Sequence, residues 1–425
     1  MNIPSFNNIT IKDYTPEKSV LKNNIPIYTF ANNDLEVVFM RIVFFNAGTI
    51  FQDKFFVSAL TKTQLAQDTK DYSDLSLADA MDYYGVSLTR ANTNERTYLT
   101  FSFLKKYQKE VVSLIEQILL LPVFKQEKLN ITIGDYRQEF LAKCQKTSFL
   151  AHREFMAGLF GKDNPYGNYA SVEDYDKVTI SDIEKFYKQR YTFNQCYIIL
   201  AGNVDKELIR LLNDSLGAYD WNSSSADTTP NNIKINTQIE PKTIITHLDN
   251  AVQASICMGR FFPSIKDEDY IPLTVLNCLF GGYFNSRLMS NIREEKGYTY
   301  GIDSFIAPFE KGSVFMIAGD VTNDKDTATI DEIKKEMNLL KTEIVSDAEL
   351  DTVKNYMIGD MLRDNDGVSE IAITYDRQIK FSLADNYNSY AMNIIKNITP
   401  DKIKELANKY FDEQQFIISI SKNNK

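Results

Sequence analysis

The chain has 425 residues, of which 44% are hydrophobic and 24% are charged, as in a globular protein with two or three domains. Its net charge of -10 argues against a nucleic-acid or anionic-membrane partner, and its longest apolar stretches are too short to span a bilayer. Four scattered cysteines without a Cys-x-x-Cys pair, and an N-terminus without a basic or apolar leader, predict a cytoplasmic protein.

Strands and helices alternate through the first half of the chain. The predicted strands cover residues 19–51, 86–105 and 195–201. The predicted helices cover residues 55–69, 76–84, 109–121, 125–160 and 179–190. Gly85 ends the second of these helices and Thr179 caps the last one.

A polar segment at 222–232, rich in Ser, Thr and Asn, has no apolar period and the composition of a linker. We therefore expect an N-terminal domain at 1–217, a linker at 218–241 and a C-terminal domain at 242–425.

The second half of the chain repeats signals of the first. Gly85 and Gly297 each follow a short helical segment (297 − 85 = 212), and Thr179 and Thr399 each begin a helix that precedes a final strand (399 − 179 = 220). The similar offsets predict two homologous domains. Each half has strands, then helices, then strands, which predicts an α+β fold with antiparallel sheets and helices packed on one face of each.

The segment 281–302 places two hydrogen-bond donors on neighbouring elements. Ser286 can cap a short helix that ends at a glycine, and the residues after it alternate as on a half-buried strand, with Tyr300 in phase with Ile302. Arg293 then lies in the last helical turn. A guanidinium and a phenol held in this way can both donate to one oxygen.

This segment contains Ser286-Arg287-Leu288, Ile292-Arg293-Glu294 and Gly297-Tyr298-Thr299-Tyr300. In these strings the chain resembles the C-terminal domain of the pitrilysin/insulinase-type metallopeptidases. The matching Arg and Tyr of that family hold the substrate at a zinc site in the N-terminal domain. The resemblance covers nearly the whole chain, and it implies two similar domains and a substrate-binding role for Arg293 and Tyr300.

The zinc motif of the family is missing. Active members carry His-x-x-Glu-His in the first helix of the N-terminal domain, where the histidines bind zinc and the Glu activates water. The aligned positions here are Ala59, Lys62 and Thr63. None of these side chains can do that work, and Lys62 would repel a cation.

The other candidate ligands do not restore a site. Glu139 lies about where the third ligand of the family falls, but without histidines we interpret it as a carboxylate on a helix surface. His152 and His247 lie far apart and are interpreted as ordinary helix and strand residues. We therefore expect no cofactor on this chain.

Two functions fit these observations. The first is a non-catalytic, substrate-binding subunit of a heterodimeric zinc metallopeptidase that cleaves peptides. Its partner would be a half-size relative that carries the zinc, and Arg293 and Tyr300 would donate to the peptide carbonyl at the partner's site. The alternative is an inert relative with a structural or peptide-binding role. The intact Arg/Tyr spacing favours the first.

Overall fold

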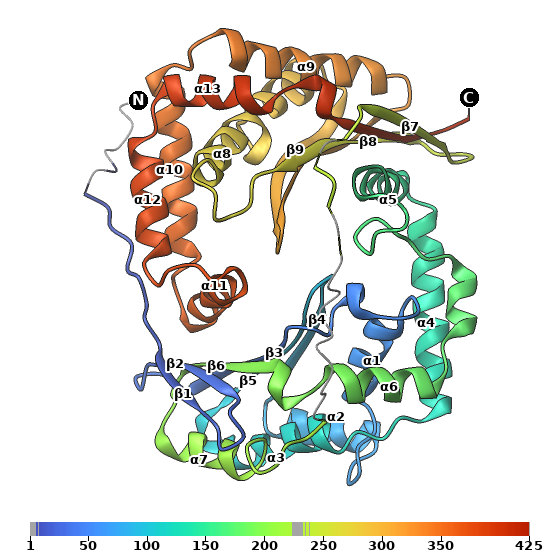
Figure 1. Cartoon of the computed structure of the whole chain (residues 1–425), viewed down its shortest axis with the longest axis vertical. Coiled ribbons are helices and arrows are strands. Elements are labelled where there is room, and N and C mark those ends of the chain that lie inside the picture. The colour runs from blue at the N-terminus through green and yellow to red at the C-terminus, as the bar shows by residue number, and fades with distance from the viewer. Residues whose placement is uncertain (1–5, 7, 223–232, 234, 238, 425) are drawn as a thin grey trace.

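The structure is a computed structural model that describes residues 6, 8–222, 233, 235–237 and 239–424. The described residues form two sheets, one from each half of the chain, with helices around them (Figure 1). Most of the predicted linker segment at 222–232 lies outside the described residues.

The first sheet has the strand order β1-β2-β6-β3-β5-β4. Its strands are β1 (Glu17–Val20), β2 (Pro26–Ala31), β3 (Val37–Phe44), β4 (Ser87–Asn92), β5 (Thr97–Leu104) and β6 (Cys196–Gly202). Side chains alternate along β3, so that Met40 and Ile42 enter one core whereas Phe39 and Val43 enter another on the opposite face.

Most helices of the first half pack on the Met40 face of this sheet. The helices are α1 (Val57–Leu65), α2 (Asp74–Tyr83), α3 (Gln108–Leu120), α4 (Gln126–Cys144), α5 (Thr147–Phe160), α6 (Ile180–Arg190) and α7 (Lys206–Asp214). Ser73 and Thr179 cap α2 and α6 by accepting a hydrogen bond from the amide three residues on.

The second sheet has the order β7-β11-β8-β10-β9 and repeats the pairing of the first without β1. Its strands are β7 (Lys242–His247), β8 (Gln253–Phe262), β9 (Thr299–Phe309), β10 (Gly312–Thr322) and β11 (Ile417–Lys422). The accompanying helices are α8 (Tyr270–Asn277), α9 (Asp326–Thr342), α10 (Asp347–Arg363), α11 (Val368–Phe381), α12 (Tyr387–Asn397) and α13 (Pro400–Tyr410), with π-helical segments at Cys278–Gly282 and Met289–Glu295.

The predicted fold of two similar α+β halves is confirmed. Gly85 and Gly297 both adopt a left-handed backbone, with φ of 63° and 66°, and Thr179 and Thr399 both cap helices through their side chains. Each sheet is antiparallel except for one pair, because β2 runs parallel to β6 and β7 runs parallel to β11.

The predicted single helix over 125–160 is wrong, since the chain breaks between α4 and α5 at Gln145 and Lys146. The break allows α5 to leave the first half and pack on β8 and β11 of the second sheet (Figure 1). In the same way α11 packs on β6, β2 and β3 of the first sheet. The prediction that helices cover one face is therefore incomplete: the second face of each sheet carries a helix from the other half.

Buried charges join α11 to the first half. Asp376 accepts a hydrogen bond from Tyr197 of β6 and lies 3.5 Å from the Arg41 guanidinium of β3. Lys380, one turn further along α11, lies 2.5 Å from the buried carboxylate of Glu95. The halves are thus held together by ion pairs as well as by apolar contacts.

Candidate functional site

A rigid π-helical segment positions Arg293. Ile292 is fully buried in the second-half core, and Asn291 donates to Glu336 at 2.7 Å on α9. Arg287, just before the segment, forms a bidentate pair with Glu349 of α10 at 2.8 and 2.9 Å. These contacts anchor the helical segment from which the half-buried Arg293 side chain projects.

Ser286 does not cap this segment through its side chain, which corrects the prediction. Its hydroxyl is buried and has no hydrogen-bond partner among the described residues, whereas its backbone carbonyl accepts from the amide of Ser290 at 2.9 Å. The helix continues from an already helical backbone at Leu288.

A β-bulge presents Tyr300 to solvent. In the pairing of β9 with β10, Gly301 faces Asp320 and Thr299 faces Val321, which leaves Tyr300 as the extra residue. The Thr299 hydroxyl supports the bulge, because it accepts from the Gly301 amide at 3.0 Å and donates to the Asp320 carbonyl at 2.5 Å.

The bulge changes the predicted alternation. Tyr300 is 98% exposed while Ile302 is buried, so the two side chains do not share a face of a regular strand. The extra residue shifts the side-chain period by one position at this point. The phenol is therefore free to meet a ligand.

Arg293 and Tyr300 line the same cavity, which has a volume of about 540 Å³ and is also bordered by Val252, Tyr298 and Asp320. The Arg293 guanidinium stacks 4.7 Å from the centroid of the Phe284 ring. Within the described part of the chain, neither Arg293 nor Tyr300 has a side-chain hydrogen bond or an ion pair. The cavity thus offers a planar cationic donor and a phenolic donor to one ligand.

The residues predicted to stand at the zinc-motif positions lie on α1. Ala59, Lys62 and Thr63 are all half-buried. The Thr63 hydroxyl lies 2.5 Å from the Tyr136 hydroxyl of α4, and the Thr63 carbonyl accepts from Arg90 of β4 at 3.1 Å. In place of metal ligands, this position holds a lysine, an arginine and a hydroxyl pair.

The charges at this position are wrong for a metal. Partial burial, and next the charge of Arg90, lowers the pKa of Lys62, and Glu139 opposes this change. Glu139 is exposed and pairs with Lys143 at 2.7 Å. Among the residues that the structure describes, no group of three or more His, Cys, Asp or Glu could hold a metal ion. The side chains at this position therefore do not fit zinc.

The two histidines lie where the sequence predicts. His152 is an exposed residue of α5 and His247 is an exposed residue at the end of β7. The Nδ1 atom of His247 lies 3.4 Å from the Asn423 carbonyl. Neither lines the Arg293 cavity. No helix in the described ranges is long and apolar enough to cross a membrane.

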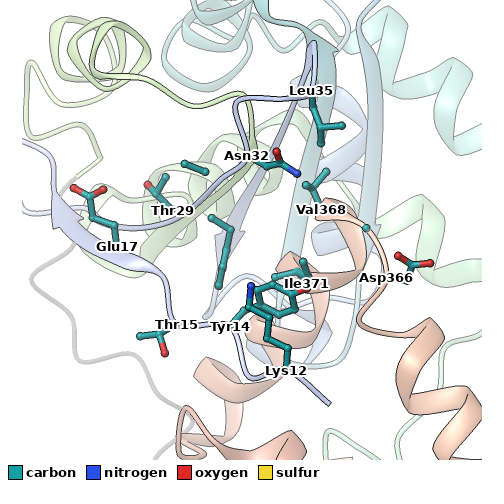
Figure 2. Close-up of a pocket in the computed structure, with 13 residues that line it drawn as sticks. Lys12, Tyr14, Thr15, Glu17, Thr29, Asn32, Leu35, Asp366, Val368 and Ile371 are labelled. Atoms are coloured by element: carbon teal, nitrogen blue, oxygen red, sulfur yellow. The ribbon is translucent and has the colours of Figure 1, made fainter. Parts of the chain in front are cut away.

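A second cavity, of about 710 Å³, lies where α11 meets the first sheet. Tyr14, Phe30 and Ile371 contribute to its walls, and Figure 2 shows the N-terminal segment and the start of α11 on either side of it. None of the predicted site residues lines this cavity, which separates it from the Arg/Tyr site.

Comparison with known proteins supports the resemblance. Residues 177–357 match the family model described as the peptidase M16 inactive domain. This segment is therefore similar to a domain of the peptidase M16 family. The match includes Arg293 and Tyr300, and it confirms the resemblance to the pitrilysin-type peptidases.

Relatives match almost the whole chain. The non-peptidase homolog YmxG of Helicobacter pylori is 23% identical and covers 94% of this chain and 92% of its own length. An uncharacterized zinc protease of Rickettsia felis is 22% identical, with 92% and 94% covered. The chain is thus related both to proteins named as zinc proteases and to one named as a non-peptidase.

Solved structures share the fold. A protease from Helicobacter pylori has a TM-score of 0.87 at 17% identity and covers 96% of this chain and 100% of its own. An M16 inactive domain from Pseudomonas fluorescens has a TM-score of 0.85 at 20% identity, with 97% and 99% covered. At these identities the comparison establishes the two-sheet architecture alone.

Proposed function

We propose that this chain is the non-catalytic, substrate-binding subunit of a heterodimeric zinc metallopeptidase that cleaves peptides. The observation that carries the proposal is the cavity of about 540 Å³ lined by both Arg293 and Tyr300. Surface arginines usually pair with a carboxylate or a carbonyl of their own protein. Here the guanidinium stacks on Phe284 instead, and its hydrogen-bond donors stay available.

The two donors would act on the peptide carbonyl oxygen. The planar Arg293 fork and the Tyr300 hydroxyl can approach this oxygen from different elements, and both interactions strengthen as negative charge develops on it. Because the helix and the bulge hold their backbones in place, the donors need little reorganisation when the peptide binds.

The zinc would come from the partner, a half-size M16 relative with an intact His-x-x-Glu-His motif. The support is the replacement of that motif here by Ala59, Lys62 and Thr63, in a chain that keeps the Arg/Tyr pair. We further propose domains at 1–217 and 242–425 joined through 218–241. We place the protein in the cytoplasm, where its thiols would stay reduced.

An inert M16 relative with a structural or peptide-binding role is the second candidate. The observation that favours it is the non-peptidase name of a relative that covers nearly the whole chain. In this candidate Arg293 and Tyr300 bind no substrate at a partner's zinc site. The two functions therefore differ in whether a mixture with a zinc-bearing relative cleaves peptides.

The experiment mixes the purified chain with a zinc-bearing half-size relative, chosen first from the product of a neighbouring gene. The chain alone should bind no stoichiometric zinc and cleave no peptide, whereas the mixture should form a complex and cleave peptides until a chelator is added. Stoichiometric zinc and chelator-sensitive proteolysis by the chain alone would refute the proposal. A complex that forms without gain of cleavage would support the inert relative.

A further inference from the structure

The position of the missing zinc motif carries two cations, Lys62 on α1 and Arg90 on β4. We propose that this Lys62–Arg90 pair binds a carboxylate group of a peptide. The inference rests on the proposed function only in taking the ligand to be a peptide. It concerns binding by this chain alone and needs neither the partner nor its zinc.

One hydrogen bond ties Arg90 to the helical turn that carries Lys62. The Arg90 Nη1 atom donates to the carbonyl of Thr63, the residue next to Lys62, at 3.1 Å. The Lys62 and Arg90 side chains are both half-buried, so water screens them only in part. The remaining donors of the Arg90 fork have no partner among the described residues, and the Lys62 ammonium has neither a hydrogen bond nor an ion pair there.

The nearby carboxylates are already paired. Glu139 lies 2.7 Å from Lys143 on the same helix, and Asp74 of α2 lies 2.8 Å from Lys128. Glu139 favours the charged form of Lys62, and Asp74 favours that of Arg90. Each carboxylate, however, forms its ion pair with another lysine. The pair therefore keeps a positive charge that the described residues do not neutralise.

Two like charges that are partly withdrawn from water raise the free energy of the folded chain. A carboxylate removes this cost, since one oxygen can accept from the planar guanidinium and the other from the ammonium. Peptides offer this group as the C-terminal carboxylate or as an Asp or Glu side chain. The ligand chemistry is the same for both.

Fluorescence anisotropy on the purified chain can separate the two sources. Three labelled peptides of one sequence serve as probes: one with a free C-terminal carboxylate, one amidated, and one amidated with an internal Glu. A charge-assisted contact predicts about tenfold tighter binding of a carboxylate peptide than of the plain amide at low salt. The Glu peptide tells whether the source is the terminus or a side chain.

Lys62→Met should abolish this preference because it keeps the side-chain length but removes the ammonium. Lys185→Met is the matched control, since it removes the same charge from a lysine already paired with Asp53 at 2.7 Å. It should leave the preference unchanged. Equal affinity of the wild type for all three peptides, or equal losses in both variants, would overturn the inference. The wild-type comparison alone decides if Lys62→Met fails to fold.

Discussion

Lys62 is a half-buried lysine at a predicted position of the missing zinc motif. This lysine on α1, beside Arg90, stands where the resemblance predicts the general base of the family motif, and burial together with the neighbouring guanidinium lowers its pKa. The folded chain therefore holds this proton less tightly than the unfolded chain does. As a result the free energy of unfolding should rise with pH between the lowered pKa and the ordinary value of about 10.4.

Lys62→Met should remove this dependence. At about pH 7 the variant should be more stable than the wild type, and the difference should shrink as the pH approaches about 10. Urea unfolding at both pH values measures it. Lys185→Met is the control. A hydrogen bond to Asp53 raises the pKa of Lys185, so this variant should be less stable than the wild type at about pH 7. A wild type that is more stable than Lys62→Met at neutral pH would contradict the account.

The sequence predicted a helical segment for Arg293 and a strand for Tyr300, but not how Tyr300 is presented. The helix–glycine–strand pattern placed Arg293 in the last helical turn and Tyr300 at the start of the strand. The exposure of Tyr300 depends on a bulge, and the bulge is set by the pairing of Asp320 with Gly301 across the sheet. Side-chain alternation within one strand carries no information on its partner, so the local pattern predicted a regular strand.

At the scale of elements, the two halves were recognisable from glycines and caps. Gly85 and Gly297 need a left-handed backbone, and Thr179 and Thr399 satisfy the amides at helix starts. Such signals are local and can be seen in a sequence. The break between α4 and α5 has neither Pro nor Gly, and the helix after it packs on the other half. A local pattern could not show it.

Gly85→Ala and Gly297→Ala should each destabilise the chain by about 1–2 kcal/mol, the usual cost of a left-handed residue with a Cβ atom. No described neighbour lies within 4 Å of the added Cβ at either position, so the cost comes from the backbone alone. Urea unfolding would measure both variants against Gly134→Ala, which lies within α4 and should stabilise by up to about 1 kcal/mol. Similar changes in the free energy of unfolding for all three variants would contradict a special need for glycine at Gly85 and Gly297.

At the scale of the molecule, α5 and α11 are exchanged between the halves, and buried charges fix α11 in place. The sequence predicted neither the exchange nor the parallel pairs β2–β6 and β7–β11. Both depend on where distant segments meet, and hydrophobic periodicity does not report strand direction or the partner of a helix face.

Lys380→Met should cost about 3–5 kcal/mol, because it leaves the buried Glu95 carboxylate without its cation between the halves. Lys18→Met is the control, since its pair with Asp385 is exposed and should be worth at most about 1 kcal/mol. Chemical unfolding compares the two. Equal and small losses would mean that the Lys380–Glu95 pair contributes little to holding the halves together.

The central claim is that Arg293 and Tyr300 serve a partner's zinc site. The most direct test is single-turnover peptide cleavage by the reconstituted pair, with complex formation checked by size. Tyr300→Phe keeps the ring but removes the donor, so it should lower the rate about 10²–10³-fold, and so should Arg293→Ala. Arg293→Lys should not restore the rate. Tyr83→Phe, at another exposed tyrosine, should leave the rate unchanged. Wild-type rates in both site variants, within an intact complex, would contradict the account.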